Sequence, residues 1–197
     1  MSDELLVAIL AAGASRRLGQ PKQLVQVGDE PLLSRQCRVA IEAEVGLVTT
    51  ILGCHADACF AALSGLNVTV RRNEQWEEGL ASSIREAASA AIDQNAAGLL
   101  ILHCDQYRIR AGDLQALHLA WTKSGRSTVC RARHDEYVGP PVIFPASCFA
   151  ALLLLPGDEG ARRVISALDS SLLIDVPMPN AVYDLDLPEQ LADVITR

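Results

Sequence analysis

The feature that most constrains this chain is an apolar run near its start that ends abruptly in a loop of small and basic residues. Residues 5–10 (LLVAIL) predict a buried β-strand. Residues 11–22 (AAGASRRLGQPK) follow without a polar bridge and contain two glycines, a serine and three cations. Small residues let backbone amides come close to a bound group, and cations neutralise an anion. The junction therefore predicts a binding site for a nucleotide triphosphate.

Two common phosphate-binding loops do not match this segment. A Walker loop has four residues between its glycines and then Lys-Ser or Lys-Thr. Here five residues separate Gly13 from Gly19, and Gln20 follows. The dinucleotide fingerprint Gly-x-Gly-x-x-Gly is absent from the sequence, which disfavours a nicotinamide-binding domain.

A third type of phosphate loop does match. The positions that fit it are Leu10, Ala11, Ala12, Gly13, Ser15, Arg17, Gly19 and Lys22. With these residues the segment resembles the signature of the nucleotidyltransferases, and specifically of the MobA-like NTP transferases, a family that includes molybdenum cofactor cytidylyltransferase. The resemblance implies that all of them except Arg17 and Gly19 bind the nucleotide. It also implies that Arg17 and Lys22 are catalytic, because they stabilise charge on the departing pyrophosphate.

The overall composition excludes several other classes. A chain of 197 residues suits one domain, and we expect a single domain over residues 1–197. A net charge of -7 argues against a nucleic-acid partner, which requires a basic face. Neither a membrane span nor a secretory signal is recognisable, so we expect a cytoplasmic protein without a membrane partner.

The cysteines predict neither a disulfide framework nor a metal site. The sequence has six cysteines and no Cys-x-x-Cys spacing, which is typical of free thiols in a reducing compartment. Cys54, His55 and Cys59 form the one notable cluster, but zinc would require a fourth ligand.

Apolar runs alternate with helical patterns along the chain. The predicted strands cover residues 5–10, 47–52, 67–70, 99–103, 127–131, 142–144 and 172–176. The predicted helices cover residues 31–44, 57–63, 80–93, 111–123, 147–154, 160–169 and 188–196. This order predicts right-handed crossovers and a mostly parallel central sheet with helices on both faces. The expected fold is a three-layer, Rossmann-like α/β fold, and the resemblance implies its GT-A-like nucleotidyltransferase form.

The strand at residues 99–103 ends in a candidate metal ligand, Asp105. A carboxylate at the mouth of a central strand suits Mg²⁺, which takes few protein ligands and also binds triphosphate oxygens. The segment resembles the Cys-Asp-Gln-Pro of molybdenum cofactor cytidylyltransferases, except that Tyr107 replaces the proline. A turn-initiating aspartate is the alternative. His103 and His134 receive no assigned role, since a histidine in a strand is usually an interior residue.

Residues 183–191 (YDLDLPEQL) supply the second candidate for Mg²⁺. They resemble the family's Asp-Ile-Asp-Thr-Pro-Glu-Asp-Leu, which implies that Asp186 is a metal ligand, with Asp184 as the second choice. Leu187 and Gln190 depart from that pattern. The alternative is that both acids cap a helix.

Residues 73–84 (NEQWEEGLASSI) offer amides, hydroxyls and a glycine just before a helix. They resemble the Asn-x-x-Trp-x-x-Gly-x-x-x-Ser segment of the family, which reads a cytosine or guanine base. This implies that Gly79, Ser82 and Ser83 bind the nucleotide. Trp76 is equally well explained as a core residue.

Two later segments are candidates for binding the second substrate. Residues 139–144 (GPPVIF) predict a stiff loop, and residues 157–162 (GDEGAR) resemble a segment of molybdopterin cytidylyltransferases. The resulting acceptor-binding candidates are Gly139, Pro140, Asp158 and Arg162. For Asp158 the alternative is an acid in the first turn of a helix.

The resemblance implies a Mg²⁺-dependent enzyme that moves CMP or GMP from CTP or GTP to a phosphorylated acceptor and releases pyrophosphate. The implied acceptor is molybdopterin carrying molybdenum, and the product would pass in a transient contact to a molybdoenzyme. Two alternatives remain. One is a sugar phosphate or another small phosphate as acceptor, and the other is a non-catalytic nucleotide-binding protein that assists maturation of a molybdenum hydroxylase.

Overall fold

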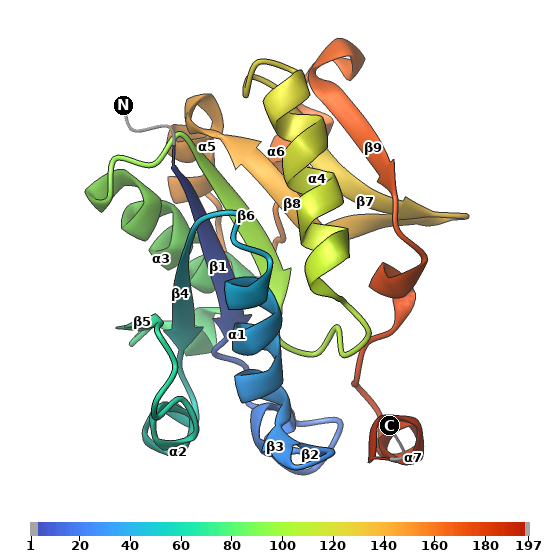
Figure 1. The fold of residues 1–197 in the computed structure, drawn as a ribbon. Helices are drawn as coiled ribbons and strands as arrows, with labels where there is room; N and C mark the ends of the chain where they lie inside the picture. The colour runs from blue at the N-terminus through green and yellow to red at the C-terminus, as the bar shows by residue number, and fades with distance from the viewer. Residues whose placement is uncertain (1–3, 196–197) are drawn as a thin grey trace.

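The computed structural model describes residues 4–195, and its core is a seven-stranded sheet (Figure 1). In spatial order the strands are β5 (Thr69–Arg72), β4 (Leu47–Leu52), β1 (Leu5–Ala11), β6 (Gly98–His103), β8 (Tyr137–Pro145), β7 (Val129–His134) and β9 (Leu173–Pro177). Only β8 runs antiparallel to its neighbours. The expectation of a mostly parallel sheet is confirmed.

Helices cover both faces of this sheet, as the expected three layers require. The longer helices are α1 (Leu32–Glu42), α3 (Leu80–Asp93) and α4 (Ala111–Lys123), and the shorter ones are α2 (Ala56–Ala62), α5 (Phe149–Leu153), α6 (Arg162–Ser166) and α7 (Leu191–Ile195). One apolar core lies between the sheet and α1, α2 and α4, and a second lies between the sheet and α3, α5 and α6. Alternate residues of β1 and β6 enter the two cores, as expected for central strands buried on both faces.

A third and smaller apolar cluster joins segments that lie far apart in the sequence. It contains Leu18 of the first loop, Val25 and Val27 near the short hairpin of β2 (Gln26–Val27) and β3 (Glu30–Pro31), Leu32, Tyr107, Leu185 and Val194. This third cluster packs the first loop against residues that follow β6 and against the C-terminal segment. It therefore fixes three chemistry-bearing stretches relative to one another.

Several predicted boundaries differ from the observed ones by two or three residues, and residue 196 of the last predicted helix lies outside the described residues. Two of the differences bear on the site. Strand β8 extends well beyond residues 142–144, because the pairing register slips between Arg131 and Ala132 and leaves Pro140 and Pro141 without a partner. A bulge of this kind accommodates prolines, which cannot donate a backbone hydrogen bond. Helix α6 begins only at Arg162, so Asp158 precedes it and is not in its first turn.

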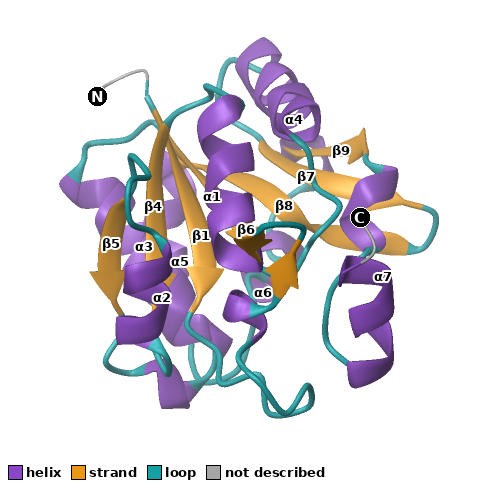
Figure 2. Ribbon diagram, turned by 60° about the horizontal axis from the view of Figure 1, so that its bottom comes forward, coloured by secondary structure: helices purple, strands orange, loops and turns teal. Residues whose placement is uncertain are grey.

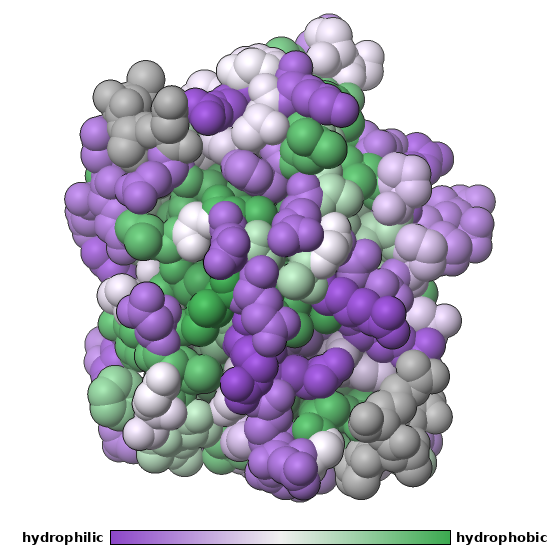
Figure 3. All heavy atoms as spheres, in the orientation of Figure 1, coloured by the Kyte–Doolittle hydropathy of each residue, from purple (hydrophilic) through white to green (hydrophobic). Residues whose placement is uncertain are grey.

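The carboxyl ends of β1, β4 and β6 lie at one edge of the sheet, and the loops that follow them gather there (Figure 2). In Figure 3, the face formed by α1 and α4 is largely hydrophilic with apolar areas between. No helix among residues 4–195 is long and apolar enough to cross a membrane.

Candidate functional site

The loop after β1 is held in shape by its own residues. The Oγ of Ser15 accepts a hydrogen bond from the backbone N–H of Lys22 at 3.0 Å, and Ser15 itself has a positive φ of 54°. The buried side chain of Gln23 donates to the carbonyl oxygens of Ala11 at 2.9 Å and Gly13 at 2.7 Å. The loop is therefore formed before any ligand binds.

Four charged side chains from three distant segments meet beside this loop. The Nζ of Lys22 contacts the carboxylate of Asp105 and lies 3.1 Å from Oδ1 of Asp186. Arg17 donates to Oδ2 of Asp186 at 2.7 Å. The backbone N–H of Leu185 donates to the carbonyl oxygen of Asp105 at 3.1 Å, which joins the last segment to the end of β6.

The charged side chains of this cluster shift one another's pKa values. Burial alone would lower the pKa of Lys22, but the carboxylates of Asp105 and Asp186 outweigh burial and raise it. The pKa of Asp184 is raised by burial and then by the negative charges of Asp105 and Asp186. Lys22 is therefore fully charged at neutral pH and offsets part of the repulsion among three acids.

The carboxylates suit a hard divalent cation. The Oδ1 of Asp105 is buried and has no hydrogen-bond partner in the described structure, and the carboxylate of Asp186 lies within reach of the same ammonium group. Mg²⁺ usually binds one or two carboxylates together with waters and substrate phosphates, so this pair fits it. Within residues 4–195 no group of three or more His, Cys, Asp or Glu side chains is placed to hold a metal ion by itself, at the cluster of Cys54, His55 and Cys59 or elsewhere.

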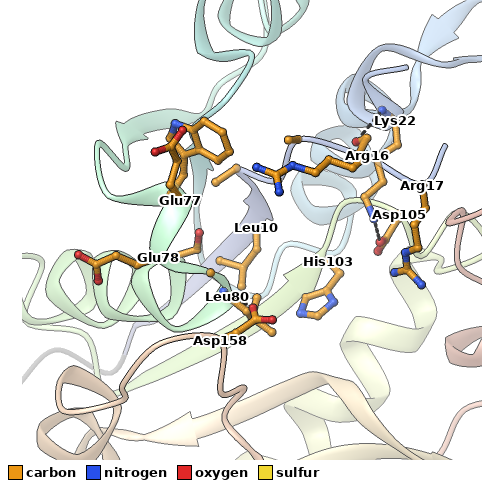
Figure 4. Close-up of a pocket in the computed structure, with 17 residues that line it drawn as sticks. Leu10, Arg16, Arg17, Lys22, Glu77, Glu78, Leu80, His103, Asp105 and Asp158 are labelled. Atoms are coloured by element: carbon orange, nitrogen blue, oxygen red, sulfur yellow. Dashed lines mark hydrogen bonds and ion pairs between the residues drawn. The ribbon is translucent and has the colours of Figure 1, made fainter. Parts of the chain in front are cut away.

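A first cavity of about 590 Å³ opens between the loop and the start of α3 (Figure 4). Its lining includes the expected nucleotide-binding residues Leu10, Ala12, Gly13, Ser15, Lys22, Gly79 and Ser83, together with Arg17 and Asp105. Trp76 also lines the cavity and is only half-buried, which favours a contact role over a core role.

Two expected nucleotide contacts, Ala11 and Ser82, do not line this cavity. Ala11 is buried at the end of β1, where its carbonyl oxygen accepts a hydrogen bond from Gln23. Ser82 accepts a hydrogen bond from the buried Nδ2 of Asn73 at 2.8 Å and donates to the carbonyl oxygen of Gly79 at 2.8 Å. The polar groups of both residues are already hydrogen-bonded to the protein. Ala11 and Ser82 therefore stabilise the wall of the cavity and do not face a nucleotide in it.

Asp158, expected at the acceptor site, lies in the first cavity instead. Its Oδ1 accepts a hydrogen bond from the backbone N–H of Leu80 at 3.1 Å, so it stabilises the N-terminus of α3 rather than of its own helix. Gly79 has a positive φ of 104°, and a Cβ there would lie 2.6 Å from this oxygen. Glycine is required at this position for both reasons.

A second cavity of about 940 Å³ lies on the α3 side of β6 and β8. Gly139, Pro140 and Arg162 line it, as expected for the acceptor site, together with many apolar side chains. Arg162 makes no side-chain hydrogen bond or ion pair with another described residue, whereas Arg131 pairs with Asp175 at 2.6 Å. The hydroxyl of Tyr137 donates to the carbonyl oxygen of Pro140 at 2.6 Å, and burial followed by the charges of Asp184 and Asp105 raises its pKa to about 12.

Gln106 connects the two parts of the site, and sequence reasoning assigned it no such role. Its Nε2 donates to the carbonyl oxygens of Pro140 at 2.8 Å and Ala181 at 3.0 Å, and its side chain is buried. Its position directly after Asp105 was the only available signal. Gln23 was also missed, because its partners are backbone carbonyls that carry no sequence signature.

His103 occupies the boundary between the two cavities. Of the described residues, only His103 and Leu80 line both. Burial lowers the pKa of His103 despite the nearby charge of Asp105, so the ring is neutral at pH 7. His134 lies at the end of β7 beside Asp135 and lines neither cavity.

The arrangement of the loop, the acids and the two cavities is suited to group transfer between two bound substrates. A preformed loop with two cations can bind a polyphosphate, two carboxylates can hold a divalent cation, and a second cavity adjoins the first. Transfer of a group between two bound substrates requires such adjacent sites.

Comparisons with known proteins agree with this architecture. Residues 7–172 match the family model described as MobA-like NTP transferase domain. The purine catabolism protein PucB of Bacillus subtilis (strain 168) is 28% identical over 213 aligned positions, which take in 100% of this chain and 98% of that protein.

Solved structures show the same fold. Rv0371c from Mycobacterium tuberculosis H37Rv matches with a TM-score of 0.82 and 25% identity over 100% of both chains, and it has also been solved in complex with manganese. A nucleotidyl transferase from Methanothermobacter thermautotroptrophicus matches with a TM-score of 0.81 over 99% of this chain and 97% of its own. At 19% identity this last likeness concerns the fold alone.

Proposed function

The chain belongs to the MobA-like NTP transferase family, and from this premise we propose that it is a metal-dependent nucleotidyltransferase that moves CMP or GMP from the triphosphate to a phosphorylated acceptor. The observation that carries the proposal is the contact of Lys22 with both Asp105 and Asp186 at the rim of the loop cavity. Had these side chains faced opposite sides of the molecule, no such enzyme could be built from them.

We assign the nucleotide to the first cavity. The triphosphate would lie along the loop at Gly13 and Ser15, where Lys22 and Arg17 neutralise its charge. The base would face the segment of Gly79 and Ser83, where backbone and hydroxyl groups can read its edge.

We assign the divalent cation to Asp105 and Asp186, with Asp184 close enough to add negative charge. When bound, the cation neutralises phosphate oxygens and thereby favours nucleophilic attack on phosphorus. The manganese complex of Rv0371c supports the use of a divalent metal. We propose Mg²⁺ for this chain.

The reaction needs no covalent intermediate with the protein. An oxygen of the acceptor phosphate forms a bond to the α-phosphorus while the bond to the pyrophosphate oxygen breaks, and that oxygen keeps the electron pair. Lys22 and Arg17 stabilise the negative charge that grows on the departing pyrophosphate. The two cavities hold the reactants in place, so positioning and electrostatics account for the catalysis.

We assign the acceptor to the second cavity, where Arg162 is available for its anionic group and Gly139 and Pro140 form one wall. We propose molybdopterin carrying molybdenum, delivered afterwards to a molybdoenzyme, and CTP as the donor. A sugar phosphate is the alternative acceptor. A second candidate is a non-catalytic nucleotide-binding accessory role, and the name of the Bacillus subtilis relative points to purine catabolism as its setting.

The test is release of pyrophosphate. The protein is incubated with Mg²⁺, with CTP or GTP, and with a panel of acceptors that includes molybdopterin and sugar phosphates. We expect one pair to release pyrophosphate. Asp105→Ala should abolish release, whereas Asp93→Asn, at an exposed ion pair with Arg71, should not. Folded protein that releases none with any pair would support the accessory role.

A further inference from the structure

The boundary between the two cavities is formed by His103 and Leu80, and only His103 brings a polar side chain to it. His103 is the last residue of β6 and pairs in register with Leu10 of β1, so its backbone is fixed in the middle of the sheet. In Figure 4 its ring lies beside Leu10 and Asp158, on the side toward Asp105.

The ring of His103 is free to bind a ligand. Neither of its ring nitrogens has a hydrogen-bond partner among the described residues, and the residue is half-buried where the two cavities adjoin. An imidazole without a protein partner can donate a hydrogen bond to a ligand that enters beside it.

The other polar groups near the second cavity are already engaged. The Tyr137 hydroxyl and the Gln106 amide both donate to the carbonyl oxygen of Pro140, and the Nε of Arg131 donates to Asp175. Arg162 is unengaged, but it lies on α6 and lines the second cavity alone. Among the described residues, His103 is the one polar side chain of the second cavity that also lines the first.

An anionic acceptor needs a donor at that point. The charges that act on His103 include the carboxylates of Asp105, Asp184 and Asp186, which repel an approaching phosphate. A divalent cation and Lys22, which act in the first cavity where the nucleotide binds, cancel part of this repulsion. An N–H donor on the acceptor side adds attraction for the phosphate at this point.

We propose that His103 contacts the acceptor directly, donating a hydrogen bond to its attacking phosphate as that group passes from the second cavity into the first. This inference rests on the proposed function, because it takes the first cavity for the nucleotide and the second for the acceptor. The phosphate oxygen that attacks is not the one that accepts the hydrogen bond. No proton is transferred, and His103 orients the acceptor toward the α-phosphorus.

The kinetic test compares three variants in the pyrophosphate assay with CTP, Mg²⁺ and molybdopterin. His103→Phe keeps a ring but loses the donor, and it should lower kcat/KM for molybdopterin about 10- to 100-fold, the value of one hydrogen bond to a charged group. The KM for CTP should stay within about threefold, because His103 adds no charge contact to the triphosphate. His103→Gln, which restores an N–H donor, should recover part of the loss. His134→Phe, outside both cavities, is the matched control and should behave as wild type.

Equal losses for CTP and molybdopterin, or normal kcat/KM in folded His103→Phe, would overturn the role of His103. Failure of His103→Gln to recover any activity would also count against it, since a purely structural role predicts no rescue. If the wild-type protein itself releases no pyrophosphate with any pair, the proposed function fails instead.

A second measurement does not depend on turnover or on the acceptor's identity. In ¹H–¹⁵N spectra of the histidine rings, His103→Phe identifies the His103 signals. Phenyl phosphate, a simple phosphate monoester, is then added to the wild-type protein that already holds CTP and Mg²⁺. We expect the His103 ring signals to shift and those of His134 to stay, whereas unmoved His103 signals would contradict the proposal.

Discussion

Arg17 and Asp186 form an ion pair at 2.7 Å although 169 positions separate them in the sequence. The pair joins the loop after β1 to the C-terminal segment, and the same carboxylate lies 3.1 Å from Nζ of Lys22. One acid thus meets two cations of the loop after β1. Because these cations are held in place beforehand, they need not be ordered when nucleotide binds.

Arg17→Ala should weaken nucleotide binding more than it weakens the fold. The Arg17 side chain is 71% exposed, and an exposed ion pair contributes at most about 1 kcal/mol to stability. Loss of a charged hydrogen bond to phosphate should lower CTP affinity roughly tenfold. Calorimetric titration and thermal unfolding measure the two effects. Arg38→Ala, at an exposed pair with Glu30, is the control, and unchanged CTP affinity in Arg17→Ala would contradict the assignment.

Gly13→Ala should leave the folded protein unchanged and still weaken CTP binding. A Cβ at Gly13 meets no protein atom within 4 Å, so only a bound group can collide with it. Overpacking of this kind costs about 1 to 3 kcal/mol of binding. At Gly53, in contrast, a Cβ would lie 2.6 Å from the carbonyl oxygen of Ala12, so Gly53→Ala should lower the unfolding temperature without ligand. Full CTP affinity in Gly13→Ala would show that the nucleotide lies elsewhere.

Gln106→Met should loosen the acceptor side of the site. The substitution keeps the volume but removes the donor to Pro140 and Ala181. The carbonyl oxygen of Ala181 is left unpaired at a cost of about 1 to 3 kcal/mol, whereas that of Pro140 keeps the hydrogen bond from the Tyr137 hydroxyl. We expect a raised KM for the acceptor and little change in the KM for CTP. Gln115→Met removes one hydrogen bond to Ala43 far from both cavities and should affect stability alone. Identical kinetics for the two variants would refute this role for Gln106.

Tyr107, which replaces the family's proline, should be important for stability. Its ring is 6% exposed in the third apolar cluster and packs edge-on against Tyr183 with a centroid distance of 6.4 Å. Tyr107→Ala should therefore cost about 3 to 5 kcal/mol, whereas Tyr107→Phe should cost under about 1 kcal/mol. Tyr107→Pro should also destabilise, since the backbone N–H donates to the carbonyl oxygen of Asp105 at 2.8 Å. Urea unfolding distinguishes these variants, and a stable Tyr107→Pro would contradict the argument.

The buried thiols of Cys37 and Cys59 predict a loss of stability in alkali. Burial raises the pKa of each from the ordinary 9.0 to about 11. Between these values the unfolded chain releases the thiol protons while the folded chain keeps them, so stability falls as pH rises. The loss approaches about 1.4 kcal/mol per pH unit for each thiol. Urea unfolding from pH 7 to 10.5 should show a shallower decline in Cys37→Ala than in wild type, and equal slopes would refute the prediction.

Much of the fold was predictable because its signals are local. The run at residues 5–10 and the helices α3 and α4 are recognisable from periodicity alone, and the structure confirms them with only one added residue, Ala11. Strand β8 was not predictable at its full length. Two prolines normally end a strand, and only pairing across a bulge shows that this one continues.

The charged residues of the site were predictable from the sequence, whereas the residues that hold the loops in place were not. Lys22, Asp105 and Asp186 stand in recognisable segments, and the structure brings them together. Gln23 and Gln106 act through backbone carbonyls contributed by other elements, so their roles appear only in three dimensions.

Asp186 lies beyond β9, the last strand of the described sheet, and is held at the site by the packing of Leu185 in the third apolar cluster and by the hydrogen bond from the Leu185 N–H to Asp105. During translation, the strands of the described sheet and the loop after β1 leave the ribosome before this carboxylate does. A product cut short after β9 would lack Asp186 and also the buried side chains of Met178, Ala181 and Leu185, so the same last segment completes both the packing and the charged cluster.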